Sequence, residues 1–328
     1  MKRCLVVLSL FALLSPAWAQ HEHRQHVMVT RQSAEARLEV RDDPAAQVLT
    51  VRVGPLNLPA HASHMAVAQA PVFYLSVPFE GWITAYHPRL VDDSGHVLPG
   101  RLLHHVAFYN TARLDFVCPN KREHIFGAGG EMNDWPALPG FGYRVHQGDR
   151  IRVGTMFHNP TETGHPRTWL EVKIEYRSVG KGEPLKSVYP TWLDVQECGD
   201  SGYDLAPGRN VSTGEIKLAY SGVLLGVGGH MHDYGQQLEL LDLTRNHEVA
   251  NLKSRLDPSG RILSMPVVYF LDQGGYKLHQ GDVLRVTATY ENSTGKAIPE
   301  GAMGIVVGYF LPENDAQLAA LGGESGKQ

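Results

Sequence analysis

The fold is indicated most clearly by two related stretches, HQGDRIRVGTMFHN (146–159) and HQGDVLRVTATYEN (279–292). In each, a Gly-Asp turn leads into a run of alternating or apolar residues, which is typical of a β-strand. The shared HQGD predicts a common hairpin in two similar sandwiches, although it is too short to prove a duplication. Similar runs lie between turn signals along the chain, whereas helical periodicity is scarce. Examples are QVLTVRV (47–53), VFYLSVPF (72–79), WLEVKIEY (169–176), QQLELLDL (236–243) and MGIVVGYFL (303–311).

This pattern predicts an all-β protein of two tandem antiparallel, jelly-roll-like β-sandwich domains. The chain has 328 residues, and its 34 glycines and 20 prolines are spaced as turns. A boundary is expected in SVGKGEPLKS (178–187). We therefore predict a first sandwich over 46–180, a second over 181–312 and a mobile tail over 313–328.

Residues 1–19 have the features of a cleaved export signal. A basic start precedes the apolar run CLVVLSLFALL (4–14), and residues 17–19 match an A-x-A cleavage site. We expect cleavage after Ala19 and a secreted or periplasmic protein. The segment 20–45 is expected to be an N-terminal arm. Its histidines, His21, His23 and His26, have either an accessory metal-binding role or none, and His21 would form a histidine brace only if it began the mature chain.

The composition limits the classes of partner. The 30 Lys+Arg against 34 Asp+Glu give a formal net charge of −4, which argues against a nucleic-acid or anionic-membrane partner. No later run is long and apolar enough for a membrane helix. In an oxidising compartment, Cys118 and Cys198 are expected to form a disulfide, with two buried free thiols as the alternative. The 17 histidines suggest metal chemistry, because imidazole is a common metal ligand.

Two histidine pairs are candidate ligands. His230 and His232 form an H-x-H motif, and on a strand such residues share a face about 7 Å apart at the backbone. The alternative is a polar strand end with two solvated rings. His104 and His105 are adjacent, so both can bind one metal only at a bulge or a distorted strand end.

Two single residues are weaker candidates. His158 ends an apolar strand, where a histidine is more often hydrogen-bonded than a ligand. Met303 lies in an apolar run, where methionine normally fills a core. No spacing rule raises either residue above these ordinary roles. The histidines in turn-like contexts, including His124, are expected to be solvated.

The order of these motifs resembles the copper type II, ascorbate-dependent monooxygenases, such as peptidylglycine α-hydroxylating monooxygenase and dopamine β-monooxygenase. HH is followed about 50 residues later by one histidine, then by H-x-H, and about 70 residues on by a methionine. The resemblance covers roughly residues 70–311. Segments that look like those around the family's ligands are YLSVPFEGWITAYHPRLV (74–91), LLHHVAFYN (102–110), IFGAGGEMNDWPALPGFGYRV (125–145) and YKLHQGDVLRVTATYENST (276–294).

The resemblance implies two copper ions, one on each sandwich, with a solvent-filled cleft between them. By position, the ligands of the electron-supplying copper are His104, His105 and His158. The catalytic residues, which hold the copper where dioxygen is activated, are His230, His232 and Met303. Imidazole and thioether ligands both suit copper, and a thioether favours its reduced state.

The implied reaction is hydroxylation of a C–H bond of a small-molecule substrate, with O₂ and ascorbate or another one-electron donor. Where peptide-amidating members have an arginine, an asparagine and a tyrosine, this chain has Gly228, Ile305 and Val307. We therefore predict a more apolar pocket and a substrate other than a glycine-extended peptide.

Two further residues near the ligands have open roles. Met156 either touches a copper site or packs, and Asp233 either orients a ligand imidazole or makes a strand-end hydrogen bond. Two other functions also stay open. One is a noncatalytic exported copper-binding or delivery protein on the same scaffold, and the other is a single Zn²⁺ held by His230 and His232. The sequence predicts no oligomeric state.

Overall fold

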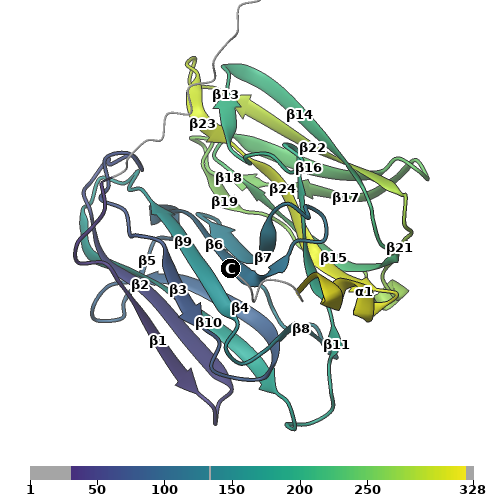
Figure 1. Cartoon of the computed structure of the whole chain (residues 1–328). Helices are drawn as coiled ribbons and strands as arrows, with labels where there is room; N and C mark the ends of the chain where they lie inside the picture. The colour runs from purple at the N-terminus through teal and green to yellow at the C-terminus, as the bar shows by residue number, and fades with distance from the viewer. Residues whose placement is uncertain (1–30, 133, 323–328) are drawn as a thin grey trace, which may run out of the picture. The chain divides into compact units, whose positions relative to one another are not determined.

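Strands from the first part of the chain form two sheets. A computed structural model describes residues 31–132 and 134–322. One sheet has the order β1-β2-β10-β4-β8-β11, with β5 on β4, and the other has the order β3-β9-β6-β7 (Figure 1). The strands are β1 (Arg37–Asp43), β2 (Val48–Leu58), β3 (Phe73–Ser76), β4 (Gly81–Val91), β5 (Val97–Leu98), β6 (Leu103–Leu114), β7 (Arg122–Gly129), β8 (Phe141–Val145), β9 (Arg150–Phe157), β10 (His165–Ser178) and β11 (Lys186–Ser187).

Strands from the second part form separate sheets. The larger ones have the orders β12-β24-β15-β20, with β21 on β15, and β14-β22-β16-β17, and two small pairs are β13-β23 and β18-β19. The strands are β12 (Tyr189–Asp194), β13 (Tyr203–Leu205), β14 (Gly208–Lys217), β15 (Gly222–Met231), β16 (Gly235–Asp242), β17 (His247–Lys253), β18 (Arg255–Leu256), β19 (Ile262–Ser264), β20 (Val268–Tyr269), β21 (Tyr276–Leu278), β22 (Val283–Asn292), β23 (Ile298–Ala302) and β24 (Gly304–Pro312). Among these named strands, only the short β8–β11 pairing is parallel. The predicted all-β sandwich fold is confirmed.

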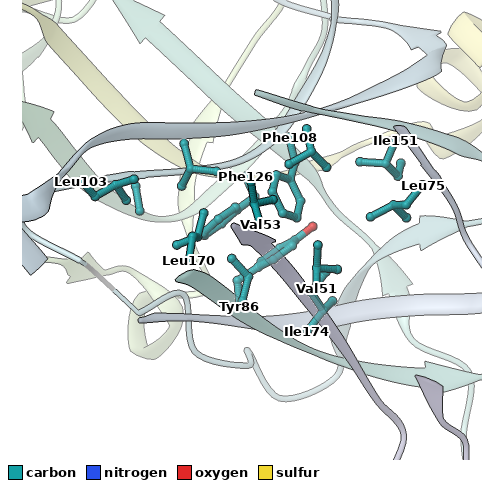
Figure 2. Packing of buried hydrophobic residues seen from close by; sticks show 14 of the residues in the cluster. Val51, Val53, Leu75, Tyr86, Leu103, Phe108, Phe126, Ile151, Leu170 and Ile174 are labelled. Carbon is teal, nitrogen blue, oxygen red and sulfur yellow. The ribbon is translucent and has the colours of Figure 1, made fainter. Parts of the chain in front are cut away.

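Alternating apolar residues build the core of the first part. Val51 and Val53 of β2 are each 1% exposed, as expected for positions that share one face. Figure 2 shows them near Tyr86 of β4, whose ring stacks on Phe126 at a centroid distance of 4.6 Å. Burying each such side chain stabilises the fold by about 1.5–3 kcal/mol. This core holds β6, β7 and β9 in place, and those strands carry site residues on their other face.

The two HQGD stretches adopt the same turn. The His146 N–H donates to Asp149 at 3.0 Å, and the His279 N–H donates to Asp282 at 2.7 Å. The glycine of each turn has a positive φ, of 92° and 94°, which glycine adopts without strain. The predicted common hairpin is not formed, because in each half the turn joins strands of different sheets: β8 pairs with β4 whereas β9 pairs with β3 and β6, and β21 pairs with β15 whereas β22 pairs with β14 and β16. The two halves therefore share the turn alone.

The end of the described chain lies in the predicted mobile tail and forms a short helix. Residues Asp315–Ala319 form helix α1, followed by the 3-10 turn η3 (Ala320–Gly322). Asn314 caps α1 by accepting a hydrogen bond from the Ala316 N–H. Leu318 is fully buried, and its carbonyl accepts from Arg113. Core contacts and this hydrogen bond attach residues 315–322 to the fold, and the mobility predicted for 313–328 stays a prediction.

The structure also bears on the predicted N-terminal arm and on the predicted disulfide. Strand β1 begins at Arg37 and pairs with β2, so the predicted arm over 20–45 is too long, and residues 37–43 belong to the first sheet. Cys118 and Cys198 form the expected disulfide, with their Cα atoms 5.6 Å apart. The export signal and the histidines of the arm lie outside the described residues. In the part of the chain that the structure describes, no helix has the length and apolar character needed to cross a membrane.

Candidate metal centre

His104 and His105 lie at a distortion of β6 that lets adjacent side chains converge. The pairing of β6 with β9 shifts register between Leu103 and His105. The Nδ1 atoms of the two histidines are 3.0 Å apart, whereas neighbours on a regular strand point to opposite faces. The irregularity that a shared metal ion would require is therefore present.

The H-x-H pair reaches the same place from β15. The ring centroids of His230 and His232 are 5.5 Å apart, in keeping with alternate residues on one face. The His232 ring also lies 4.7 Å from the His104 ring, edge to face. One ring nitrogen from each of His104, His105 and His232 lies within 4.8 Å of the others. Imidazoles from both halves of the chain thus meet in one cluster.

Two further histidines flank His104. The ring centroids of His158 and His64 each lie 5.1 Å from that of His104, at interplanar angles of 69° and 66°. His158 follows β9, and its ring hydrogen-bonds to the Arg101 main chain. His64 comes from the segment between β2 and β3 and was not predicted.

A buried glutamine explains why His64 lies here. The Gln69 amide nitrogen donates to the carbonyls of His64 and Phe157, both at 2.8 Å, and its oxygen accepts from the Phe157 N–H at 2.8 Å. Since Phe157 immediately precedes His158, Gln69 ties the two histidine segments together. A link between residues so far apart in the chain leaves no local pattern in the sequence. The excess of histidine is the only sequence feature that could have drawn attention to His64.

Glu131, also not predicted, holds His230. Its Oε1 lies 2.9 Å from His230 Nδ1, and the two side chains are 3% and 12% exposed. Burial opposes the charge of Glu131, but the neighbouring His230 and hydrogen bonds lower the pKa of its carboxyl overall. With Nδ1–H donating to the carboxylate, His230 presents Nε2 as a ligand atom. A Cβ on Gly129 would lie 2.6 Å from atoms of both side chains, so this approach requires glycine.

Tyr290 connects the segments that carry His232 and Met303. Its buried hydroxyl accepts from the main-chain N–H of His232 at 3.0 Å and of Met303 at 3.1 Å, and it donates to the Met303 carbonyl. One hydroxyl therefore sets the relative position of two predicted ligands. The spacing of a tyrosine in a strand gives no hint of this role.

Four of the clustered histidines are kept uncharged, whereas the Glu131 carboxylate raises the pKa of His230 against the effect of its burial. Burial, followed by the adjacent imidazoles, lowers the pKa of His105 to about 4 and also lowers the pKa of His104 and His232. Burial lowers the pKa of His158 to about 4. Neutral imidazole offers the lone pair that a metal needs.

An orphaned nitrogen gives a test of whether a metal fits. His232 Nε2 is buried and has no hydrogen-bond partner among the described residues, while its ring hydrogen-bonds to the Glu300 main chain. Buried polar atoms are normally paired, so this nitrogen is suited to a metal ion. Imidazoles with the neighbouring thioether of Met303, and without a thiolate, make a donor set that copper accepts.

An apolar cavity of about 360 Å³ adjoins the cluster. His105 and Met156 lie opposite each other in the β6–β9 pairing, and both line the cavity together with His230 and Met303. Aromatic and aliphatic side chains form much of the remaining wall. They include Val106, Tyr109, Trp135, Trp192, Val267, Tyr269, Ile305, Val307 and Tyr309.

Three expectations are corrected or sharpened. Asp233 accepts from the Ile262 N–H at 2.9 Å, so it makes a strand-end hydrogen bond, and Glu131 is the carboxylate on a ligand ring. His124, expected to be solvated, is stacked between Tyr109 and Trp192 at centroid distances of 4.2 and 3.5 Å. The solvent-filled cleft implied between two metal sites is not seen where the rings of His104 and His232 touch. The number of metal ions stays a prediction.

Two curated relatives have detectable sequence similarity. "Probable copper-dependent oxygenase M1" of Phoma sp. is 25% identical over 146 residues, which are 41% of this chain and 36% of that protein. "Probable copper-dependent oxygenase clz3" of Cochliobolus lunatus is 24% identical over 246 residues, which are 66% of this chain and 76% of that protein. The match to the first relative therefore spans only about a third of its length.

The other comparisons add no family. No family model matches the chain. A solved structure of Sulfolobus Turreted Icosahedral Virus covers 88% of this chain and 96% of its own, with 9% identity and a TM-score of 0.37, which is too low to support an argument. The chain is thus similar, at low identity, to two proteins named as copper-dependent oxygenases.

Proposed function

We propose that this chain is an exported copper-dependent monooxygenase, akin to the peptidylglycine and dopamine monooxygenases. It would hydroxylate a C–H bond of a small or apolar substrate with O₂ and a one-electron donor such as ascorbate. The observation that carries the proposal is the neutral imidazole cluster with an orphaned His232 nitrogen beside an apolar cavity. The names of the two curated relatives support a copper oxygenase.

The proposed ligands divide by their position in the chain. His104, His105 and His158 would hold one copper ion, and His230, His232 and Met303 would hold the other and form the catalytic set. When bound, copper supplies the one-electron chemistry with dioxygen that no side chain of this protein can perform.

The chain's own residues orient and protect this chemistry. Glu131 keeps the Nδ1 proton of His230 and leaves Nε2 as the ligand atom. Tyr290 fixes the main chain at His232 and Met303. The apolar walls exclude water from the substrate and hold its C–H bond beside the ligands.

The cavity supports a substrate other than a glycine-extended peptide. Gly228, Ile305 and Val307 line it and offer no side-chain group that could hold a peptide carboxylate at those positions. The check is turnover of a glycine-extended peptide by the copper-loaded enzyme with ascorbate. We expect no glyoxylate above background, and efficient release would refute this part of the proposal.

The proposal is tested by copper content and oxygen uptake in wild type and Met303→Leu. Leucine keeps the volume but removes the thioether, so substrate-stimulated oxygen uptake should fall about tenfold or more. The matched control is Met265→Leu in the second core, which should stay within about twofold. Copper binding with no substrate-coupled uptake over a broad panel of apolar compounds would instead establish the noncatalytic copper-binding protein.

A further inference from the structure

Arg152 is the one arginine or lysine among the described residues that line the mainly apolar cavity, and it lacks an acidic partner. It lines the cavity from β9, and no carboxylate of the described residues lies within 4.0 Å of it. Its guanidinium carbon lies 5.2 Å from the centre of the Tyr109 ring. The two acids in the cavity lining, Glu131 and Asp134, are already paired with His230 and His87.

Arg152 lies on the same sheet as His105 of the metal cluster, two rows of residues further along the strands. The strand order β9-β6-β7 of this sheet brings residues into rows on the face that lines the cavity. The first row holds Met156, His105 and Gly129. The next holds Gly154, Ala107 and Gly127, and the third holds Arg152, Tyr109 and His124. Successive rows are about 7 Å apart, so Arg152 begins roughly 13 Å from the metal row.

The small residues of the middle row leave space in the cavity over Gly154, whereas the Trp192 ring fills the position over Gly127, where a Cβ would lie 2.6 Å from it. The three residues of this row have no side chain larger than methyl, and a Cβ on Gly154 would meet nothing nearer than the Arg152 guanidinium, at 3.9 and 4.0 Å. The guanidinium therefore extends over Gly154, toward the metal row. Trp192, Val307 and Tyr309 from β12 and β24 form apolar wall.

A partly desolvated guanidinium favours an anion that matches its planar fork, and a carboxylate does so with two hydrogen bonds. We infer that the substrate is an elongated apolar monocarboxylate. Its carboxylate pairs with Arg152, and its apolar body spans roughly 7–13 Å toward His105 and Met303. This inference rests on the proposed function, because only that function makes the bound monocarboxylate a substrate. The anchor is Arg152 on β9, whereas Gly228 lies on β15.

Ligand binding to the copper-free protein tests this site, with the fluorescence of Trp135 and Trp192 in the cavity wall as the readout. The probes are 4-phenylbutyrate and its neutral amide. Wild type should bind the acid about tenfold or more tightly than the amide, because one charge-assisted hydrogen-bonded pair contributes an affinity difference of about this size. Arg152→Gln should lose this preference while its amide affinity stays within about twofold, and Arg152→Lys should lie between.

The control is Arg150→Gln, since Arg150 lies on the same strand over the Tyr74 ring at 4.0 Å and outside the cavity lining. It should keep the wild-type preference, and equal thermal midpoints would show that all variants fold. Equal binding of acid and amide by wild type, no binding of either, or a preference retained in Arg152→Gln would overturn the inference. Arg152-dependent binding without oxygen uptake by the copper-loaded enzyme would refute the proposed function and leave the anion site intact.

Discussion

Replacing Tyr290 by phenylalanine removes one hydroxyl that serves two proposed ligands. The Tyr290 oxygen accepts from the main-chain N–H of His232 at 3.0 Å and of Met303 at 3.1 Å, and it donates to the Met303 carbonyl. Tyr290 is 1% exposed, so phenylalanine leaves three main-chain groups without a partner in a dry setting. At about 1 kcal/mol for each lost partner, the free energy of unfolding should fall by about 3 kcal/mol.

The assay is urea denaturation of the copper-free protein, with Tyr86→Phe as the matched control. The Tyr86 hydroxyl is also buried but has no hydrogen-bond partner among the described residues (Figure 2). Its removal should change stability by about 0 kcal/mol or slightly stabilise. A loss below about 1 kcal/mol for Tyr290→Phe, or equal losses for the two variants, would refute the reasoning. Copper affinity should also fall about tenfold or more in Tyr290→Phe alone.

Three further substitutions test the surroundings of the cluster. Gly129→Ala places a Cβ 2.6 Å from the paired carboxylate and imidazole, so copper affinity should fall about tenfold. The control Gly130→Ala, whose Cβ would have its nearest atom at 3.4 Å, should bind copper with wild-type affinity. Equal copper affinities for the two variants would contradict this reasoning. His64→Gln should alter the electron paramagnetic resonance spectrum of bound Cu(II), and the exposed His61→Gln should not; two unchanged spectra would exclude His64 from the centre. Gly154→Leu should fill the cavity and abolish 4-phenylbutyrate binding with copper content unchanged, and intact binding would show that the ligand lies elsewhere.

The features predicted from the sequence are those with a local pattern. Alternation in QVLTVRV (47–53) predicts β2, because burial on one face of a strand has a period of two. The H-x-H spacing predicts two rings on one face, and HH requires a bulge or a distorted strand end if both rings are to bind one metal, since neighbours otherwise diverge. All three expectations agree with the structure.

The site residues that the sequence did not predict make contacts with residues far away in the chain. Glu131 meets His230 from 99 positions away, and Gln69 bonds Phe157 from 88 positions away. Sequence periodicity describes one strand at a time, so it cannot show which strand faces another. For the same reason the sequence does not show that the two proposed ligand sets approach each other, with the rings of His104 and His232 4.7 Å apart.

The most direct test of the proposed centre is X-ray absorption spectroscopy of the Cu(I)-loaded protein, in wild type and Met303→Leu. We predict nitrogen and sulfur scatterers around copper in wild type, and loss of the sulfur scatterer with retention of the imidazoles in Met303→Leu. Identical spectra for the two proteins, or a wild-type spectrum without imidazole scattering, would contradict copper held by His230, His232 and Met303.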